Sequence, residues 1–165
     1  MTIFTRARTI GLALAALIFA ADQAMKHFIV NVLGLTQIGD HYPLLPFFDF
    51  TRTNNTGVSL GMFSATSMEM RWILVLVWLL RERRLWDIVP LGMILGGALG
   101  NIVDRYRFGY VIDYADLHIG EFRPFLIFNV ADAAITIGVV IILARALFIR
   151  EKPANGQGSA PTDAA

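Results

Sequence analysis

The chain has 165 residues, of which 56% are apolar and only 16% are charged. Soluble domains hold about 45–50% apolar and about 25% charged residues, so this composition, with a mean hydropathy of +0.58, indicates a membrane protein of one domain. A net charge of +1 gives no electrostatic reason to expect a nucleic acid as partner. The absence of cysteine excludes disulfides, thiolate metal sites, a cysteine nucleophile and lipid attachment through a cysteine.

The first apolar segment follows a short basic start. Apolar sequence resumes at Phe28, so we expect one retained helix over about residues 9–33. A cleaved signal peptide is the alternative, because alanines stand near a possible cleavage site. Asp22 and Lys26 interrupt the segment at a spacing of four residues, where they share a helix face and can neutralise each other. If Asp22 and Lys26 do no more than neutralise each other, their role is to fix the packing of this helix.

Two polar segments between the apolar runs have strand-like patterns. Residues 36–67 are punctuated by Pro, Asn and Gly, and residues 47–53 are rich in aromatic residues and threonine. Residues 110–119 alternate in part between apolar and polar side chains. We therefore expect a small antiparallel β-sheet outside the membrane.

The second apolar segment is short. Only nine residues, 72–80, separate Arg71 from Arg81. Nine helical residues rise about 14 Å, against a hydrocarbon core of about 30 Å. We place a span over about residues 67–80 because the topology requires one, with the two arginines extending to the membrane surfaces.

Two longer apolar segments complete a single transmembrane domain over residues 1–150. A third span is expected over about residues 87–103, where Gly96 and Gly100 at a spacing of four favour close helix contact. A fourth is expected over about residues 125–148. The predicted fold class is mainly α, with four transmembrane helices and the small sheet.

The positive charges indicate an orientation. Eight Lys and Arg residues fall on one side of the four spans and five on the other, and the richer side is expected to be cytoplasmic. Both termini then lie inside, and residues 151–165, rich in Pro, Gly and Ala, predict a disordered cytoplasmic tail. The richer side comprises Arg6, Arg8, Arg81, Arg83, Arg84, Arg145, Arg150 and Lys152, and the poorer side Arg52, Arg71, Arg105, Arg107 and Arg123.

Three of the spans carry polar side chains at a similar depth. Asp22 lies 14 residues after Arg8, and Asp132 lies 13 residues before Arg145. At the rise of a helix, both carboxylates lie about 20 Å from these basic anchors, and Asn101 lies about 25 Å from the arginines before its span. The polar groups therefore converge near the outer surface.

The four-residue motif Asn-x-x-Asp occurs twice in this layer, as Asn101-Ile-Val-Asp104 and Asn129-Val-Ala-Asp132, and Asp113 lies between these two phrases in the sequence. Residues three apart share a helix face, and ionisable groups beside lipid-spanning sequence indicate function because they are costly to keep there. Two facing carboxylates share a proton and can hold a water between base and acid. The residues predict an aspartate-based active site that needs neither metal nor cofactor.

Other roles for the same residues stay open. Asp104 and Arg105 can form an ion pair at a helix end, and Asn101 and Asn129 can hydrogen-bond between helices. The three histidines are scattered, and no serine has a recognisable base beside it. A proton-coupled carrier would need polar groups through the whole bilayer, whereas the cytoplasmic halves of the first and fourth spans are uncharged. A non-enzymatic adaptor gives no reason for carboxylates to gather at one depth.

Five motifs resemble those of the lipoprotein signal peptidases (signal peptidase II). They are Asp22-x-x-x-Lys26, Asn55-Thr-Gly57, Gly-Asn101-x-x-Asp104-Arg105, Val-Ile-Asp113-Tyr and Phe-Asn129-x-Ala131-Asp132. The resemblance covers about residues 10–145 and implies a four-helix aspartic peptidase of the bacterial inner membrane, with a small periplasmic sheet and no cofactor. The implied substrate is a prolipoprotein whose cysteine carries diacylglycerol, cut just before that cysteine. The Gly-x-Gly-Asp motif of another class of membrane aspartic protease is absent.

The resemblance also implies roles for individual residues. Asp113 and Asp132 would form the catalytic dyad. The site would be supported by Asn101, Asp104, Arg105, Asn129 and Ala131, while Asp22, Lys26, Asn55 and Gly57 would shape the cleft and hold substrate. Besides the lipid-modified prolipoprotein, membrane lipid is an expected partner, nucleic acid is not, and the protein is expected to be a monomer.

Overall fold

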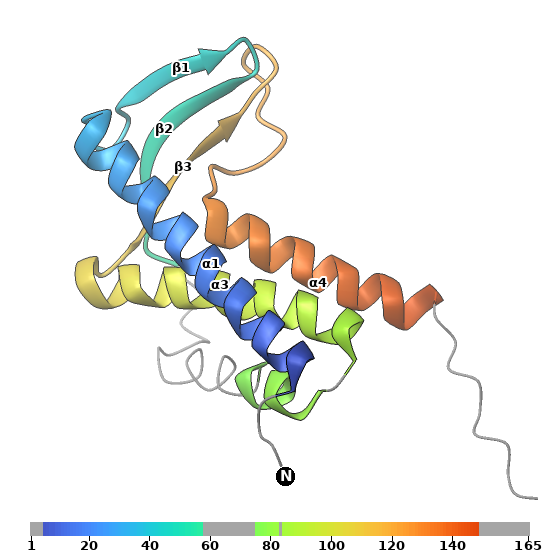
Figure 1. Ribbon diagram of the computed structural model, residues 1–165. Helices are drawn as coiled ribbons and strands as arrows, with labels where there is room; N and C mark the ends of the chain where they lie inside the picture. Colours follow the sequence, from blue (N-terminus) through green and yellow to red (C-terminus); the bar gives the residue numbers. More distant parts are fainter. Residues whose placement is uncertain (1–4, 58–74, 83, 149–165) are drawn as a thin grey trace, which may run out of the picture.

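The computed structural model describes residues 5–57, 75–82 and 84–148. Three of its helical segments are long and apolar enough to cross a membrane: Arg6–Val32, Leu85–Phe108 and Val130–Phe148. A short helix over residues 75–81 and a three-stranded antiparallel sheet complete the described fold (Figure 1). In chain order the elements are α1 (Arg6–His27), the π-helical turn η1 (Phe28–Val32), β1 (His41–Leu45), β2 (Phe48–Asn55), α3 (Leu85–Phe108), β3 (Val111–Leu117) and α4 (Val130–Phe148).

The expected second span, residues 67–80, lies mostly outside the described residues. Within the described part, residues 75–81 are helical. The structure therefore shows three membrane-length helices and a short one, and the fourth crossing of the membrane stays a prediction. The expected tail, residues 151–165, also lies outside the described residues.

The ends of α1 and α3 follow local sequence. Thr5 caps α1, because its hydroxyl oxygen accepts a hydrogen bond from the backbone N–H of Arg8 (3.4 Å). Helix α3 runs beyond the expected residues 87–103 and ends only at Phe108. Two arginines in its last turn suit the negative end of the helix dipole, and Gly109, with φ of 79°, ends the helix in the left-handed conformation.

Helix α4 begins at Val130, five residues later than the expected start at residue 125. The preceding residues are held away from a helix by the sheet. Phe128 forms an isolated antiparallel bridge with Ala115 of β3, and both backbone hydrogen bonds of that bridge are made. The start of α4 is therefore fixed at the edge of the sheet.

Small residues let the long helices approach closely. Gly96 of α3 lies against α1, where a Cβ would stand 2.5 Å from the carbonyl oxygen of Ala15. Gly97 faces the backbone of α4 in the same way. At Gly100, a Cβ would stand 3.0 Å from Cγ of Asp22, so glycine leaves the room that this carboxylate occupies. The close helix contact predicted for the Gly96 and Gly100 pair is confirmed.

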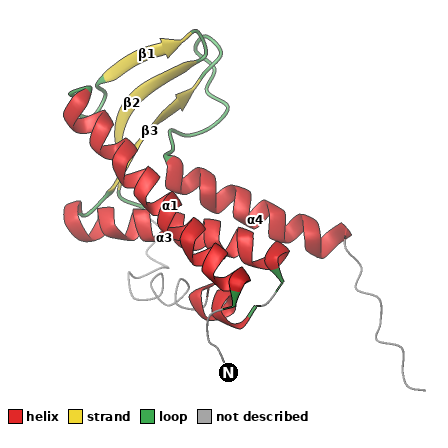
Figure 2. Ribbon diagram, viewed as in Figure 1, coloured by secondary structure: helices red, strands yellow, loops and turns green. Residues whose placement is uncertain are grey.

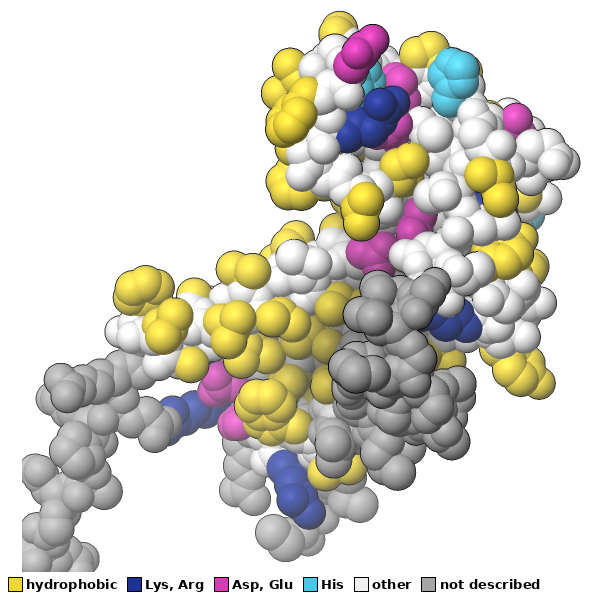
Figure 3. Space-filling model, turned by 180° about the vertical axis from the view of Figure 1, so that it is seen from behind, with side chains coloured by type: hydrophobic (Ala, Val, Ile, Leu, Met, Phe, Trp, Pro, Cys, Tyr) yellow, Lys and Arg dark blue, Asp and Glu magenta, His cyan; other side chains and the backbone are white. Residues whose placement is uncertain are grey.

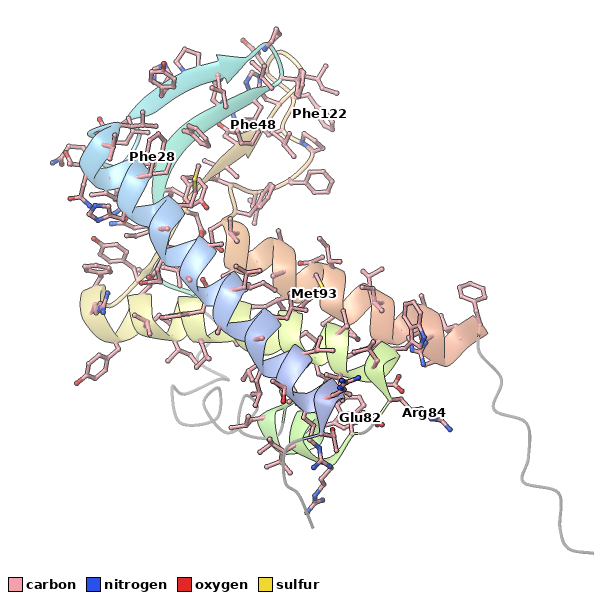
Figure 4. The ribbon with its side chains drawn as sticks, viewed as in Figure 1. Phe28, Phe48, Glu82, Arg84, Met93 and Phe122 are labelled. Carbon is pink, nitrogen blue, oxygen red and sulfur yellow. The ribbon has the colours of Figure 1, made fainter. Side chains whose placement is uncertain are left out.

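The sheet lies at one end of the long helices (Figure 2). Its strand order is β1-β2-β3, and Thr53 of β2 pairs with Asp113 of β3. The strands expected from residues 47–53 and 110–119 are confirmed as β2, which continues to Asn55, and β3. Figure 4 shows Phe28, Phe48 and Phe122 near the sheet, and Glu82 and Arg84 at the far end of the helices.

Helix α4 presents apolar side chains outward. Ile137, Val140, Leu143 and Leu147 are each at least half exposed, and Figure 3 shows hydrophobic side chains gathered along this helix. Such a surface suits contact with lipid chains, because a membrane-length apolar helix is solvated by hydrocarbon.

Candidate active site

The second Asn-x-x-Asp phrase begins α4 as a capping box. Oδ1 of Asn129 accepts a hydrogen bond from the backbone N–H of Asp132 (2.8 Å). In return, Oδ2 of Asp132 accepts one from the backbone N–H of Asn129 (3.4 Å). This exchange satisfies two N–H groups at the helix start. It also fixes Asp132 at the N-terminus of α4, where the helix dipole favours a carboxylate.

The first phrase lies inside α3, so its side chains contact other elements. Nδ2 of Asn101 donates to Oδ1 of Asp132 (2.8 Å), and Oδ1 of Asn101 accepts from Nδ2 of Asn129 (3.2 Å). Oδ2 of Asp104 accepts from the backbone N–H of Ile112 (3.1 Å) and ties α3 to β3. The side chains of the two phrases therefore hydrogen-bond to each other directly.

Asp113 reaches the same cluster from β3. It is buried, and its Oδ1 accepts a hydrogen bond from Nδ2 of Asn129 at 2.6 Å. Burial and then the charge of Asp132 raise the pKa of Asp113 to about 6, against lowering effects of hydrogen bonds from Asn55 and Asn129 and the charge of Lys26. A second carboxylate nearby disfavours the charged form of the first, which is the direction of this effect of Asp132.

A buried charge cluster from α1 lies beside these aspartates. Nζ of Lys26 is 2.8 Å from Oδ2 of Asp22 and 2.8 Å from Oδ2 of Asp104. It also donates to Oδ1 of Asn101 (3.4 Å). Oδ1 of Asp22 accepts from the backbone N–H of Ala131 (3.1 Å), in the first turn of α4. One polar network thus joins α1, α3 and α4.

The resemblance implies that Asp22 and Lys26 shape the cleft and hold substrate, and the structure places both in the interior. Their exposed fractions are 0% and 3%, and their polar atoms face each other and the neighbouring helices. Their role in holding substrate stays a prediction. Their contacts fit the alternative of a neutralised pair that fixes helix packing, extended to a third helix.

The remaining expected residues differ in their distance from the cluster. Asn55, at the end of β2, hydrogen-bonds Asp113, and its Oδ1 accepts from the backbone N–H of Gly57 (2.9 Å). Gly57 has φ of 90°, a conformation that favours glycine. Ala131 contributes its backbone N–H. Arg105 is half-buried near the end of α3, and among the described residues no side-chain hydrogen bond joins it to the cluster.

Two polar contacts are not evident from the sequence. Nε2 of Gln23 donates to Oδ1 of Asp104 (3.0 Å) and to Oδ2 of Asp22 (3.2 Å). Its position beside Asp22 in an apolar segment is the one feature of the sequence that could have indicated this role. Asp116 is fully buried and accepts from Nε of Arg123 (3.1 Å). That contact holds the loop after β3 against the sheet, and no spacing in the sequence indicates it.

Two apolar cavities adjoin the aspartates. Asp132 is half-buried and reaches one of about 300 Å³, while the other, of about 320 Å³, lies beneath the sheet. The first is lined by Leu117, Phe125, Leu126, Phe128, Asp132, Ala133, Thr136 and Ile137. An apolar substrate therefore has room beside the aspartate pair.

The arrangement suits acid–base chemistry on a water molecule. One carboxyl is buried with a raised pKa, and its partner accepts hydrogen bonds at a helix N-terminus, so their environments differ as those of an acid and a base do. Across the described ranges, no three His, Asp or Glu side chains are placed to share a metal ion.

Comparison with known proteins agrees with this chemistry. A family model described as Signal peptidase (SPase) II matches residues 14–148. The chain is 48% identical over 163 residues to the lipoprotein signal peptidase of Sphingopyxis alaskensis, which covers 93% of this chain and 94% of that protein. It is 46% identical over 154 residues to the lipoprotein signal peptidase of Rhizorhabdus wittichii, with coverage of 87% and 89%.

A solved structure described as a bacterial membrane enzyme is similar in fold. Its TM-score is 0.71 at 30% identity, and the alignment covers 86% of this chain and 95% of that one. This chain is accordingly a mainly helical membrane enzyme with several membrane-spanning helices. Because the family match and both relatives extend over most of its length, the chain belongs to the signal peptidase II family of aspartic peptidases.

Proposed function

We propose that this enzyme removes the signal peptide from diacylglyceryl-modified prolipoproteins and cuts just before the lipidated cysteine. The observation that carries the proposal is the double contact of Asn129, whose Nδ2 lies 2.6 Å from Asp113 and whose Oδ1 lies 2.8 Å from the backbone nitrogen of Asp132. It joins the carboxylate of Asp113 on β3 to the first turn of α4, which carries Asp132, beside an apolar cavity. Such a pair suits amide hydrolysis by water, and the relatives are named lipoprotein signal peptidases.

In the proposed reaction Asp113 holds the shared proton and Asp132 is ionised. The raised pKa of Asp113, about 6, supports this assignment, as do the hydrogen bonds that Asp132 accepts from Asn101 and Asn129. Asp132 takes a proton from a water molecule whose oxygen attacks the scissile carbonyl carbon, while Asp113 protonates the carbonyl oxygen. Asp132 then protonates the amide nitrogen, the C–N bond breaks, and Asp113 recovers a proton from the diol.

The surroundings of the dyad support a lipid-modified substrate. The cavity that Asp132 reaches is lined almost entirely by apolar side chains. A diacylglyceryl group would hold the scissile bond near the outer headgroup layer, because its acyl chains partition into hydrocarbon. Water reaches that layer, whereas the bilayer centre is dry.

The proposed topology has four spans, both termini in the cytoplasm and the sheet on the periplasmic side of the inner membrane. The eight-to-five distribution of Lys and Arg supports it. Reporter fusions at Asn55 and Gly120 should give a periplasmic signal, and a fusion at Arg83 a cytoplasmic one. A cytoplasmic signal at Asn55 would reverse the orientation.

The direct test uses the purified protein in detergent and two precursor peptides of identical sequence, one with diacylglyceryl on its cysteine and one without. We expect cleavage just before the modified cysteine and no cleavage of the unmodified peptide. Asp132→Asn is the control for contaminating protease. Equal cleavage of both peptides would contradict the substrate class, and cleavage of neither by folded protein would contradict the whole proposal.

A further inference from the structure

Lys26 is a buried cation whose three N–H groups all face acceptors. Its side chain is 4% exposed, and Nζ contacts Oδ2 of Asp22 and Oδ2 of Asp104, each at 2.8 Å, and Oδ1 of Asn101 at 3.4 Å. An ammonium group has three donors and no acceptor. The two carboxylates balance its charge. The contact with Asn101 does not help to balance the charge, because a side-chain amide is neutral.

The amide of Asn101 lies between Lys26 and the dyad. Only the oxygen of an amide can face an ammonium group, since the ammonium cannot accept a hydrogen bond. With Oδ1 on the side of Lys26, Nδ2 is directed to Oδ1 of Asp132, 2.8 Å away. Nδ2 of Asn129 donates to the same Asn101 oxygen (3.2 Å) and favours the same orientation.

The proposed reaction makes that orientation matter. While Asp132 is ionised, its carboxylate itself attracts the Nδ2 group of Asn101. Once Asp132 has taken a proton from water, its O–H is a donor and would favour a turned amide with the oxygen facing it. Lys26 continues to hold the amide oxygen in this step, because an ammonium group has donors only. It also polarises the amide, which strengthens the N–H donors at the other end.

We propose that Lys26 is a positioning residue of the reaction, which keeps the Asn101 amide nitrogen directed at Asp132 throughout turnover. The inference rests on the proposed function and deepens it: Lys26 does not touch substrate and acts through Asn101. The competing explanation is that Lys26 only neutralises Asp22 and Asp104. The two explanations predict different outcomes for a charge-balanced double variant.

The charge-balanced test compares Lys26→Met with Lys26→Met/Asp22→Asn. Two carboxylates and one ammonium give the Lys26, Asp22 and Asp104 cluster a net charge of −1, and the double variant keeps −1 through Asp104 alone. We expect kcat to fall roughly 10- to 100-fold in both variants, by analogy with outer-shell residues that orient the ligands of a metal, with KM unchanged. The double variant should regain thermal stability and not kcat. A double variant with wild-type kcat would overturn the proposal.

A second test asks whether Lys26 acts through Asn101. The variant Lys26→Met/Asn101→Ala should have the kcat of Asn101→Ala alone, because the amide that Lys26 holds is already gone. A loss equal to the product of the two single losses would show an independent role and contradict the proposal. Lys26→Arg, which keeps a donor-only cation, should retain more kcat than Lys26→Met.

The control is Arg107→Met, which removes an exposed cation near the end of α3 that makes no described hydrogen bond to the cluster. Its kcat should equal that of the wild type. All variants are assayed on the diacylglyceryl-modified precursor with binding and thermal unfolding measured on the same preparations. Absence of cleavage by the wild type would contradict the proposed function, whereas wild-type kcat in a folded Lys26→Met would contradict this inference alone.

Discussion

The two Asn-x-x-Asp phrases have the same spacing and opposite positions in their helices. Asn129 and Asp132 begin α4, where free backbone N–H groups let the two side chains form a capping box. Asn101 and Asp104 lie inside α3, where the backbone N–H groups are already paired, and their side chains contact other elements. Position in the helix, rather than spacing, decides whether such a pair can cap its own helix, since both pairs also contact other elements.

This difference predicts that the two phrases contribute unequally to stability and to catalysis. The α3 phrase is tied to the buried ion pair of Lys26 with Asp104, and breaking a buried pair typically costs about 3–5 kcal/mol. The α4 phrase forms a helix cap, which is typically worth about 1 kcal/mol, and leaves Oδ1 of Asp132 facing Asn101 and the active site. We therefore expect the α3 phrase to contribute more to folding and the α4 phrase more to catalysis.

The largest expected effect is on the dyad. Asp132→Asn and Asp113→Asn should each reduce cleavage by at least about 10³-fold, and the double variant should be scarcely worse, because residues that act as a unit are non-additive. The assay is signal-peptide release from a diacylglyceryl precursor. Binding should stay near wild type, and neither single variant should unfold at a lower temperature than the wild type. Substantial cleavage by Asp132→Asn would contradict the dyad, and activity lost only together with folding would return both aspartates to a structural role.

The matched change in the other phrase is Asp104→Asn. It should destabilise the protein by about 3 kcal/mol, at the low end for a broken buried pair because Lys26 retains Asp22. Measurable turnover should remain. Thermal unfolding and kcat measured together test the comparison with Asp132→Asn. Equal loss of activity without loss of stability would show that the two phrases do not differ as we infer.

Asp113 should give stability an unusual dependence on pH. Its pKa is raised from 3.8 to about 6, so between these values the folded protein keeps a proton that the unfolded chain releases. The free energy of unfolding is then highest below about pH 4 and falls by about 3 kcal/mol as pH rises to about 6. Asp113→Asn, which resembles the protonated form, should remove this slope in thermal unfolding, while Asp104→Asn should keep it. Identical slopes in wild type and Asp113→Asn would contradict the burial effect.

The smallest expected effect concerns the helix cap. Serine caps helices about as well as asparagine, so Asn129→Ser should lose about 1 kcal/mol less free energy of unfolding than Asn129→Ala. Both variants lose the contacts that Nδ2 of Asn129 makes with Asp113 and Asn101, so the difference between them isolates the cap. Asn101 has no cap to preserve, so Asn101→Ser and Asn101→Ala should lose nearly the same free energy of unfolding. Chemical denaturation of the four variants measures the two differences. An equal difference between serine and alanine at both positions would remove the distinction between the phrases.

Several features of the fold were predictable because they depend on neighbouring residues. Apolar length predicts the three long helices, and aromatic-rich and alternating patterns predict β2 and β3. The start of α4 was placed too early, at residue 125, because pattern alone does not show that Phe128 bridges to Ala115. The pairing of Asp116 with Arg123 was missed for a related reason, since the loop must fold back before the two residues meet.

The sequence by itself determined which residues can form the site, since the polar groups are rare within apolar segments and their depth follows from the helical rise. Only the tertiary structure decided their partners. Lys26 meets Asn101 across 75 residues of sequence, and Asp22 meets Ala131 across 109. Such contacts depend on how closely the helices cross, which Gly96 and Gly100 permit, and on sheet register, which places Asp113 opposite Thr53. The sequence decides which chemical groups are present, whereas the packing of distant elements decides which partners those groups contact.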